Sequence, residues 1–157
     1  MEEKLPIGTV TLGEGWRNRT TYLFSKEVEA GLQAPLAGGG GPPPTALLTY
    51  SLSTAELPPD TNLEASVKQQ ARSFQLQMDG YKLHSQEPWT HPVYGDLPTL
   101  DFSFSTPEGQ RLRQVQAYLP WPNGHTFTCI GLSTVESEFD RNRAELVKAF
   151  EDFELVG

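Results

Sequence analysis

The sequence predicts an α+β domain, in which a curved antiparallel sheet of about six or seven strands is flanked by helices. Three observations lead to this prediction. Several short segments alternate between apolar and polar residues, as half-buried strands do, and turn residues separate them. One segment with helical periodicity follows the third strand, and a second one closes the chain. The resulting order, β-β-β-α-β-β-β-β-α, is typical of an antiparallel sheet with helices packed on it.

The first two strands are expected at Thr9 to Leu12 and Thr20 to Ser25, joined as an opening hairpin by a loop that begins Gly-Glu-Gly-Trp. A third strand covers Thr45 to Leu52. Four more strands follow the first helix, at Tyr81 to Glu87, Leu97 to Ser105, Gln110 to Leu119 and Thr126 to Leu132. Turn signals at residues 106–109 and 122–124 make the last three strands a meander.

The first helix is expected between Thr61 and Gly80, because each end carries a signal. Thr61 and Glu64 have the spacing of a capping box, and Gly80 stands where a left-handed C-cap would. The apolar stripe of this helix comprises Leu63, Val67, Ala71, Phe74 and Met78. A second helix, from about Ser137 to Asp152, repeats Phe139, Arg143, Leu146, Phe150 and Phe153 every three or four residues.

Two glutamines interrupt otherwise apolar rows. Gln70 falls about 20° from Leu63 around the first helix, so it is expected to face the same way as the apolar stripe. Gln114 shares one face of its strand with Leu112. A buried amide without a partner costs on the order of 1–3 kcal/mol, so each glutamine needs a partner inside the fold or in a docked molecule. Either a satisfied glutamine at the edge of the core or a binding surface fits this pattern.

The composition limits the classes of function. A chain of 157 residues with 37% hydrophobic residues is one ordinary domain, and we expect a single domain over residues 1–157. Residues 29–44, with four consecutive Gly and three consecutive Pro, are expected to form a flexible insertion. A net charge of −8 argues against nucleic acid as a partner. No signal peptide or membrane span is recognisable, which predicts a cytoplasmic protein without direct membrane insertion.

The sequence contains no motif that indicates an enzyme. Its three histidines, His84, His91 and His125, stand in different segments without metal-ligand spacing, and no phosphate-binding or nucleophile motif is present, so we expect neither a metal nor a cofactor. Asp101, on the polar row of its strand, is expected either to be solvated or to pair with an arginine such as Arg111 or Arg113 across the hairpin. The single cysteine, Cys129, lies in a largely apolar run and is expected to be a core thiol.

A set of short segments resembles the DcrB-related Eag family, the effector-associated chaperones of the bacterial type VI secretion system. The segments are GEGW, TALLTYS, VKQQARSF followed by QMDGYKLH, LDFSF and RLRQVQAY. The resemblance implies a PsbP-like fold, a homodimer, and a groove that binds the N-terminal hydrophobic, membrane-spanning helices of a PAAR or Rhs type effector before export from a Gram-negative bacterium. By position it implies that client helices are bound by Thr21, Leu23, Thr49, Ser51, Gln70, Phe74, Met78, Leu112 and Gln114.

A second interpretation is a PsbP-like accessory or regulatory module, which binds a protein partner and no transmembrane client. A co-purified client that begins with a hydrophobic helix would separate the two interpretations. An enzyme is a third possibility, which a stoichiometric metal or nucleotide in the purified protein would favour.

Overall fold

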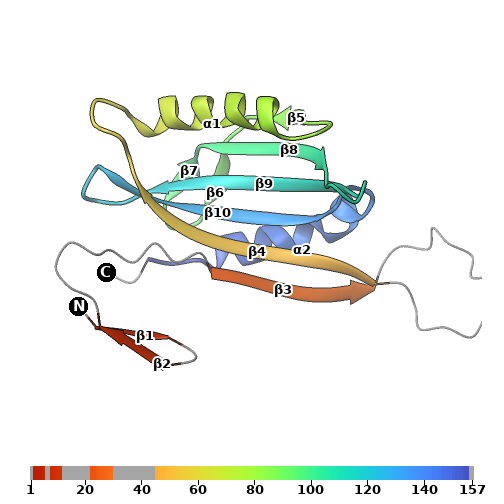
Figure 1. Cartoon of the computed structure of the whole chain (residues 1–157), viewed down its shortest axis with the longest axis horizontal. Coiled ribbons are helices and arrows are strands. Elements are labelled where there is room, and N and C mark those ends of the chain that lie inside the picture. The colour runs from red at the N-terminus through yellow and green to blue at the C-terminus, as the bar shows by residue number, and fades with distance from the viewer. Residues whose placement is uncertain (1, 6–7, 12–21, 30–44, 156–157) are drawn as a thin grey trace, which may run out of the picture.

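The computed structural model of the chain describes residues 2–5, 8–11, 22–29 and 45–155. Its centre is a six-stranded antiparallel sheet in the order β3-β4-β10-β9-β8-β5 (Figure 1). The strands are β3 (Tyr22–Glu29), β4 (Thr45–Glu56), β5 (Lys82–Ser85), β8 (Thr99–Ser105), β9 (Arg111–Pro120) and β10 (Thr126–Val135). Helices α1 (Leu63–Gln77) and α2 (Phe139–Glu151) pack on opposite faces of this sheet. The predicted α+β class and the meander β8-β9-β10 are therefore confirmed.

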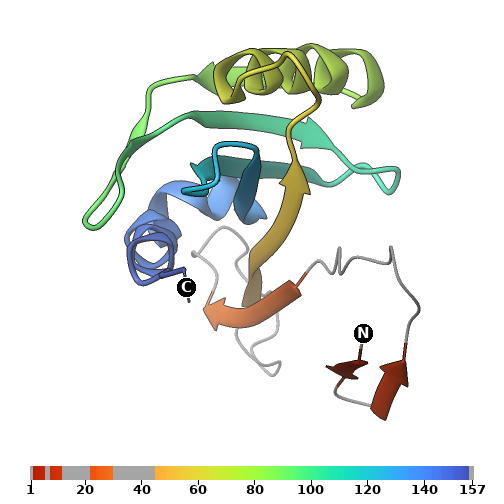
Figure 2. The ribbon, with the colours of Figure 1, turned by 90° about the vertical axis from the view of Figure 1, so that its left-hand side faces the viewer.

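The sheet is strongly twisted, and α2 and α1 lie on different sides of it (Figure 2). On the α2 side, buried Val115, Leu119, Ile130 and Leu132 of β9 and β10 pack against Phe139, Leu146 and Phe150, with a short 3₁₀ turn, η1 (Glu136–Glu138), leading into the helix. On the α1 side, Val67 packs against Leu100, Phe102 and Tyr118. Alternate residues of each strand thus point to opposite faces of the sheet and belong to two separate cores.

The predicted opening hairpin is wrong. Strand β2 (Gly8–Thr11) pairs with β1 (Glu2–Leu5), and β3 pairs with β4 over its whole length of eight residues. The longer ladder explains the outcome, because a four-residue strand could satisfy only half of the backbone groups of β3. A second small hairpin, β6 (Trp89–His91) with β7 (Gly95–Leu97), was also not predicted. Residue 29 of the expected insertion ends β3, and residues 30–44 lie outside the described part of the chain.

Helix α1 begins one residue later than predicted. The side chain of Asn62, not of Thr61, accepts a hydrogen bond from the backbone N–H of Ala65 at 2.8 Å. Asparagine is among the strongest N-caps, so it takes the place of the expected capping box. The helix ends at Gln77, and Gly80 follows in the turn into β5 with a φ of 62°, in the left-handed region that favours glycine.

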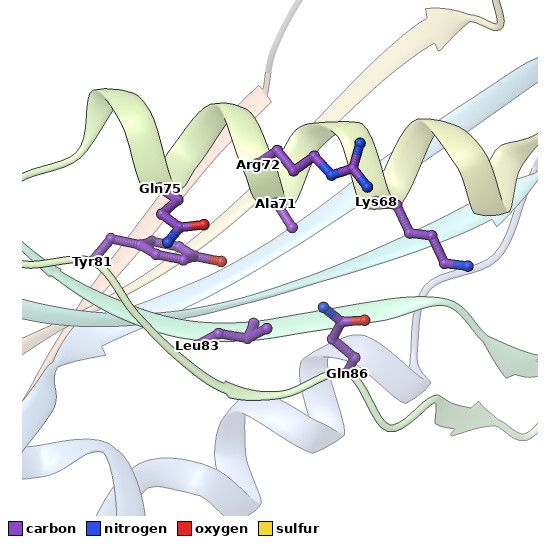
Figure 3. A pocket seen from close by; sticks show the side chains of 7 residues that line it. All are labelled: Lys68, Ala71, Arg72, Gln75, Tyr81, Leu83 and Gln86. Carbon is purple, nitrogen blue, oxygen red and sulfur yellow. The ribbon is translucent and has the colours of Figure 1, made fainter.

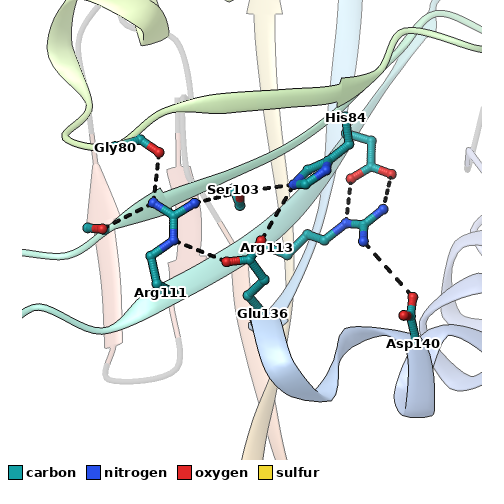
Figure 4. Close-up of polar contacts among 9 residues, drawn as sticks. Gly80, His84, Ser103, Arg111, Arg113, Glu136 and Asp140 are labelled. Atoms are coloured by element: carbon teal, nitrogen blue, oxygen red, sulfur yellow. Dashed lines mark hydrogen bonds and ion pairs between the residues drawn. The ribbon is translucent and has the colours of Figure 1, made fainter.

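Both faces of β8 are buried, although the sequence pattern predicts one. Thr99, Asp101 and Ser103 on its polar row are as inaccessible as the apolar row. A network of ion pairs and hydrogen bonds covers Asp101 and Ser103 (Figure 4). Arg113 of β9 donates two hydrogen bonds of 2.9 Å to Asp101, and its guanidinium lies 4.2 Å from the ring centre of Phe139. The hydrogen bond to Asp101 raises the pKa of Arg113.

Arg111 completes the network at the adjacent end of β9. Its guanidinium donates to the Glu136 carboxylate at 3.1 Å, to the Gly80 carbonyl at 2.7 Å and to the hydroxyl of Ser103 at 2.8 Å. Burial alone would raise the pKa of Glu136, but hydrogen bonds from Arg111 and Ser103 outweigh it and lower that pKa. The network ties β5, β8 and β9 to the start of α2, so it is structural.

Replacing Arg113 by alanine should destabilise the protein by about 3 kcal/mol, because the substitution leaves the buried carboxylate of Asp101 without its partner. The free energy of unfolding, measured by urea titration followed by circular dichroism, checks this value. The double variant Asp101→Leu/Arg113→Met removes both charges and should lose less. A loss under about 1 kcal/mol in Arg113→Ala would contradict the role given to the pair.

Candidate functional site: an open face of the sheet

Helix α1 covers only part of its face of the sheet. It packs on β8 and β9, while β4 and β3 run clear of it in Figure 1. Two rows of directly opposed residues cross the sheet from the exposed edge to the space beneath α1. One row is Leu23, Ser51, Gly131, Gln116 and Leu100; the next is Ser25, Thr49, Ser133, Gln114 and Phe102. Each row therefore begins in solvent and ends in the α1 core.

The part of this surface that no described helix covers is called the open face. It consists of Leu23, Leu47, Thr49, Ser51, Ser53, Leu112, Gln114, Gln116, Gly131 and Ser133. Leucines stand at its outer edge, where Leu23 is 68% and Leu47 is 49% exposed. Small hydroxyl residues and amides fill its centre. The open face thus combines apolar contact area with a few hydrogen-bonding groups.

Gly131 keeps the centre of the open face flat. A Cβ atom at this position would lie 2.4 Å from the Ser51 hydroxyl and 3.6 Å from the Gln114 amide nitrogen. A side chain here would displace Ser51 and raise the surface between the two polar groups. The glycine therefore makes room for the Ser51 side chain, which lies over it.

Five of the residues implicated by sequence lie together on the open face: Leu23, Thr49, Ser51, Leu112 and Gln114. Thr21 lies outside the described residues. Phe74, on α1, and Met78, its C-cap, point toward the sheet and pack on the core between α1 and the sheet. The ring of Phe74 is 5.0 Å from that of Phe102. Phe74 and Met78 are both partly buried, so each offers a partner only part of its surface.

The expectation that Gln70 shares the buried stripe of α1 is wrong, because its side chain is exposed. Lys68, Arg72 and Gln75 line a pocket on the flank of α1 that faces β5. The helical phase puts Gln70 on the opposite flank, toward β10 and β4. An angle of about 60° from the centre of the stripe is enough to bring a side chain out of the core. Gln70 therefore borders the open face rather than the core.

The two amides flagged by sequence are unpartnered within the described residues. Neither Gln70 nor Gln114 makes a hydrogen bond there, whereas Gln116 accepts one of 2.7 Å from the hydroxyl of Tyr118. Periodicity found Gln114 but not Gly131, Ser53 or Ser133. The signal for these three is the run of small residues that alternates with Ile130 and Leu132 in β10 and opposes small residues in β4.

The open face carries no activated nucleophile among its described residues. Burial raises the pKa of the neighbouring Cys129 thiol to about 12, so the thiol stays protonated at neutral pH. On the other face, Ser103 and His84 are 2.9 Å apart, but Glu136 approaches the same ring nitrogen, Nε2, at 3.7 Å. A nucleophile, base and orienting acid would need both ring nitrogens. In the described residues, no three potential ligands come together to hold a metal ion.

No helix among the described residues is long and apolar enough to cross a membrane. No family model matches the sequence, and a search of characterised proteins finds no relative. Solved structures do resemble this one. PA94 from Pseudomonas aeruginosa, described as a protein of unknown function and candidate regulator, aligns over 100% of this chain and 97% of its own with a TM-score of 0.69 at 16% identity.

Two further solved structures align less well with this one. PsbP from Synechocystis aligns with a TM-score of 0.49 at 11% identity, over 94% of this chain and 98% of its own. LpqN of Mycobacterium tuberculosis, which is involved in cell envelope biogenesis, aligns with a TM-score of 0.43 at 11% identity, over 89% and 85%. At 16% identity, the likeness to PA94 shows the fold and not the function, and membership of the Eag family is a proposal.

The two neighbouring glutamines of β9 should respond differently to leucine. Gln114→Leu removes no hydrogen bond to a described residue, so the free energy of unfolding should change by less than about 0.5 kcal/mol. Gln116→Leu leaves the largely buried Tyr118 hydroxyl unpaired and should cost about 1–3 kcal/mol. Thermal and urea unfolding of both variants measure the difference. A marked loss in Gln114→Leu would mean that its amide supports the fold.

Proposed function

We propose that the protein is a chaperone that binds and shields the N-terminal hydrophobic transmembrane helices of a type VI secretion effector of the PAAR or Rhs type before export. The observation that carries the proposal is the open face. The resemblance of the sequence to the Eag chaperones names the client, and the open face supplies a surface with the chemistry that such a client needs.

A client helix of about 20 apolar residues exposes its surface to water unless a partner covers it. Leu23 and Leu47 offer apolar area at the outer edge of the open face, and α1 borders its opposite side. Between them, Ser51 and Ser133 are small and partly exposed, so a helix can approach closely. Small residues with occasional hydroxyls are what membrane helices use to pack on one another, so the open face imitates a neighbouring membrane helix.

The glutamines add polar recognition. A client helix carries some polar groups: side-chain hydroxyls, and backbone groups at small residues or where a helical turn is broken. These groups lose their water when a partner covers the helix. Gln114, on the open face, and Gln70, beside it, make no side-chain hydrogen bond to a described residue, and a flexible amide can donate or accept. The net charge of −8 keeps a loaded complex apart from anionic lipid surfaces.

A homodimer belongs to the proposal. Strand β3 stands at the edge of the sheet, and within the described residues its outer edge has no strand partner. Tyr22, Leu23 and Phe24 are each more than half exposed on this strand. An exposed apolar edge strand is a site for association with another chain, and a second copy would extend the open face across a two-fold axis.

The accessory or regulatory module remains the alternative. The PA94 comparison is compatible with it, since that protein is described as a candidate regulator. Such a module would bind the folded surface of a partner and would have no preference for an apolar helix. Binding of a client fragment that contains only its N-terminal apolar segment decides between the two.

Client capture should be lost when a charge is placed on the open face. Leu23→Glu and Leu47→Glu each put an unpaired carboxylate against an apolar helix, and both residues are exposed enough for the fold to survive. Leu76→Glu is the matched control, because Leu76 is 87% exposed on the outer side of α1. The measurement is recovery of a co-expressed N-terminal effector fragment on each variant, with melting temperatures recorded alongside. Equal recovery by all three variants would refute the proposal.

Light scattering should give twice the chain mass of 17.4 kDa at micromolar concentration. Phe24→Lys should shift the mass toward that of one chain, because a charge then lies on the paired edge. Val93→Lys, at a residue that is 60% exposed in the β6-β7 turn, is the control and should stay dimeric. A wild-type mass of one chain would remove the dimer from the proposal and leave the open face as a monomeric site.

A further inference from the structure

A pocket lies on the flank of α1 that faces away from the open face. It occupies about 540 Å³ between α1 and the edge strand β5 and is lined by Lys68, Ala71, Arg72, Gln75, Tyr81, Leu83 and Gln86 (Figure 3). This volume is in the range of small-molecule sites, about 300–1,000 Å³. Its position on the other side of α1 makes it independent of the proposed client surface.

The walls of the pocket differ in chemistry. Ala71, Leu83 and the ring of Tyr81 form an apolar floor between the helix and the strand, and the ring of Tyr81 is itself held 5.5 Å from that of Phe102. Lys68 and Arg72 project from the helix above this floor (Figure 3). None of the lining residues is acidic, in a chain whose net charge is −8. The pocket is therefore a locally cationic site with an apolar base.

The cations are available to a ligand. Arg72 forms no ion pair with a described residue. Lys68 pairs with Glu64 at 3.4 Å, but the two side chains are 63% and 77% exposed, and exposed helical pairs of this kind contribute only about 0.3–0.5 kcal/mol. An incoming anion can therefore replace Glu64 at little cost.

The hydroxyl of Tyr81 lies beneath this floor. Its oxygen is buried, and within the described residues it has no hydrogen-bond partner. Burial raises the pKa of Tyr81, so the hydroxyl keeps its proton. Because water does not reach this oxygen, a molecule in the pocket contacts the ring of Tyr81 and not its hydroxyl.

We propose that this pocket binds a small amphipathic anion, a carboxylate or phosphate head group on an apolar chain or ring. The head group lies between Lys68 and Arg72 and accepts charge-assisted hydrogen bonds from both. The apolar body lies on Ala71, Leu83 and the Tyr81 ring, and the amides of Gln75 and Gln86 border the entrance.

Titration of the isotope-labelled full chain with decanoate and with decyl phosphate, each below its micelle concentration, tests the proposal by amide chemical-shift mapping. The expected result is saturable binding of at least one of them, with the largest shifts at Ala71, Tyr81 and Leu83. Decyltrimethylammonium carries the same chain with the opposite charge and should not produce these shifts. The relative affinity of decanoate and decyl phosphate identifies the preferred head group.

Matched variants separate the pocket from general apolar binding. Lys68→Gln/Arg72→Gln should weaken binding about tenfold or more, since two charge-assisted contacts are lost. Tyr81→Phe keeps the ring in the apolar floor and breaks no hydrogen bond to a described residue, so it should bind as wild type does. Arg141→Gln/Lys148→Gln on α2 removes the same charge elsewhere and should bind as wild type. The proposal is overturned by absence of binding at millimolar anion, by equal shifts with the cation, by shifts confined to the open face, or by unchanged affinity in Lys68→Gln/Arg72→Gln.

Discussion

The packing of Phe74 against Phe102, with ring centres 5.0 Å apart, holds α1 over β8 and β9 and so decides which part of the sheet stays open. Tyr81 and Phe104 add rings around the same point, at 5.5 Å and 6.0 Å from Phe102. Aromatic contacts of this kind fix a helix laterally as well as vertically, because their geometry is specific. With α1 held at the β5 side, the parts of the two opposed rows on β3 and β4, including Ser51 and Thr49, remain without a described helix above them.

Fixing α1 at this position also gives its two flanks different surroundings. One flank, with Lys68 and Arg72, overhangs the edge strand β5 and forms a cationic pocket. The other, where the helical phase puts Gln70, borders a face of serines, threonines and leucines. A single helix therefore separates a site suited to a small anion from a surface suited to an apolar helix. The two can be altered independently, because no residue belongs to both.

Local patterns in the sequence predicted much of the fold. Alternation identified β8, β9 and β10, and the glycines of their turns, Gly109 and Gly124, have the positive φ that these turns need. Long-range pairing was beyond such patterns, since nothing near β3 indicates that it pairs with β4 and not with β2.

The burial of Asp101 was missed for a similar reason: a polar row looks solvated until Arg113 and the start of α2 are brought over it. The position of Gln70 around α1 was predicted from helical angles alone. An angle of about 60° from the centre of the apolar stripe decides whether a side chain lies in the core or at the surface. Gln114 was located correctly on its row because a strand has only two faces.

The central claim is that the open face holds an apolar helix, and photo-crosslinking tests it most directly. A benzoylphenylalanine residue in place of Ser53, on the open face, should crosslink to a co-expressed N-terminal effector fragment, and the crosslinked peptide should fall within its apolar segment. The same residue in place of Arg141, exposed on α2 at the opposite side of the sheet, should give no adduct. Adducts from position 141 and none from position 53, with both proteins folded and the fragment bound, would contradict the account.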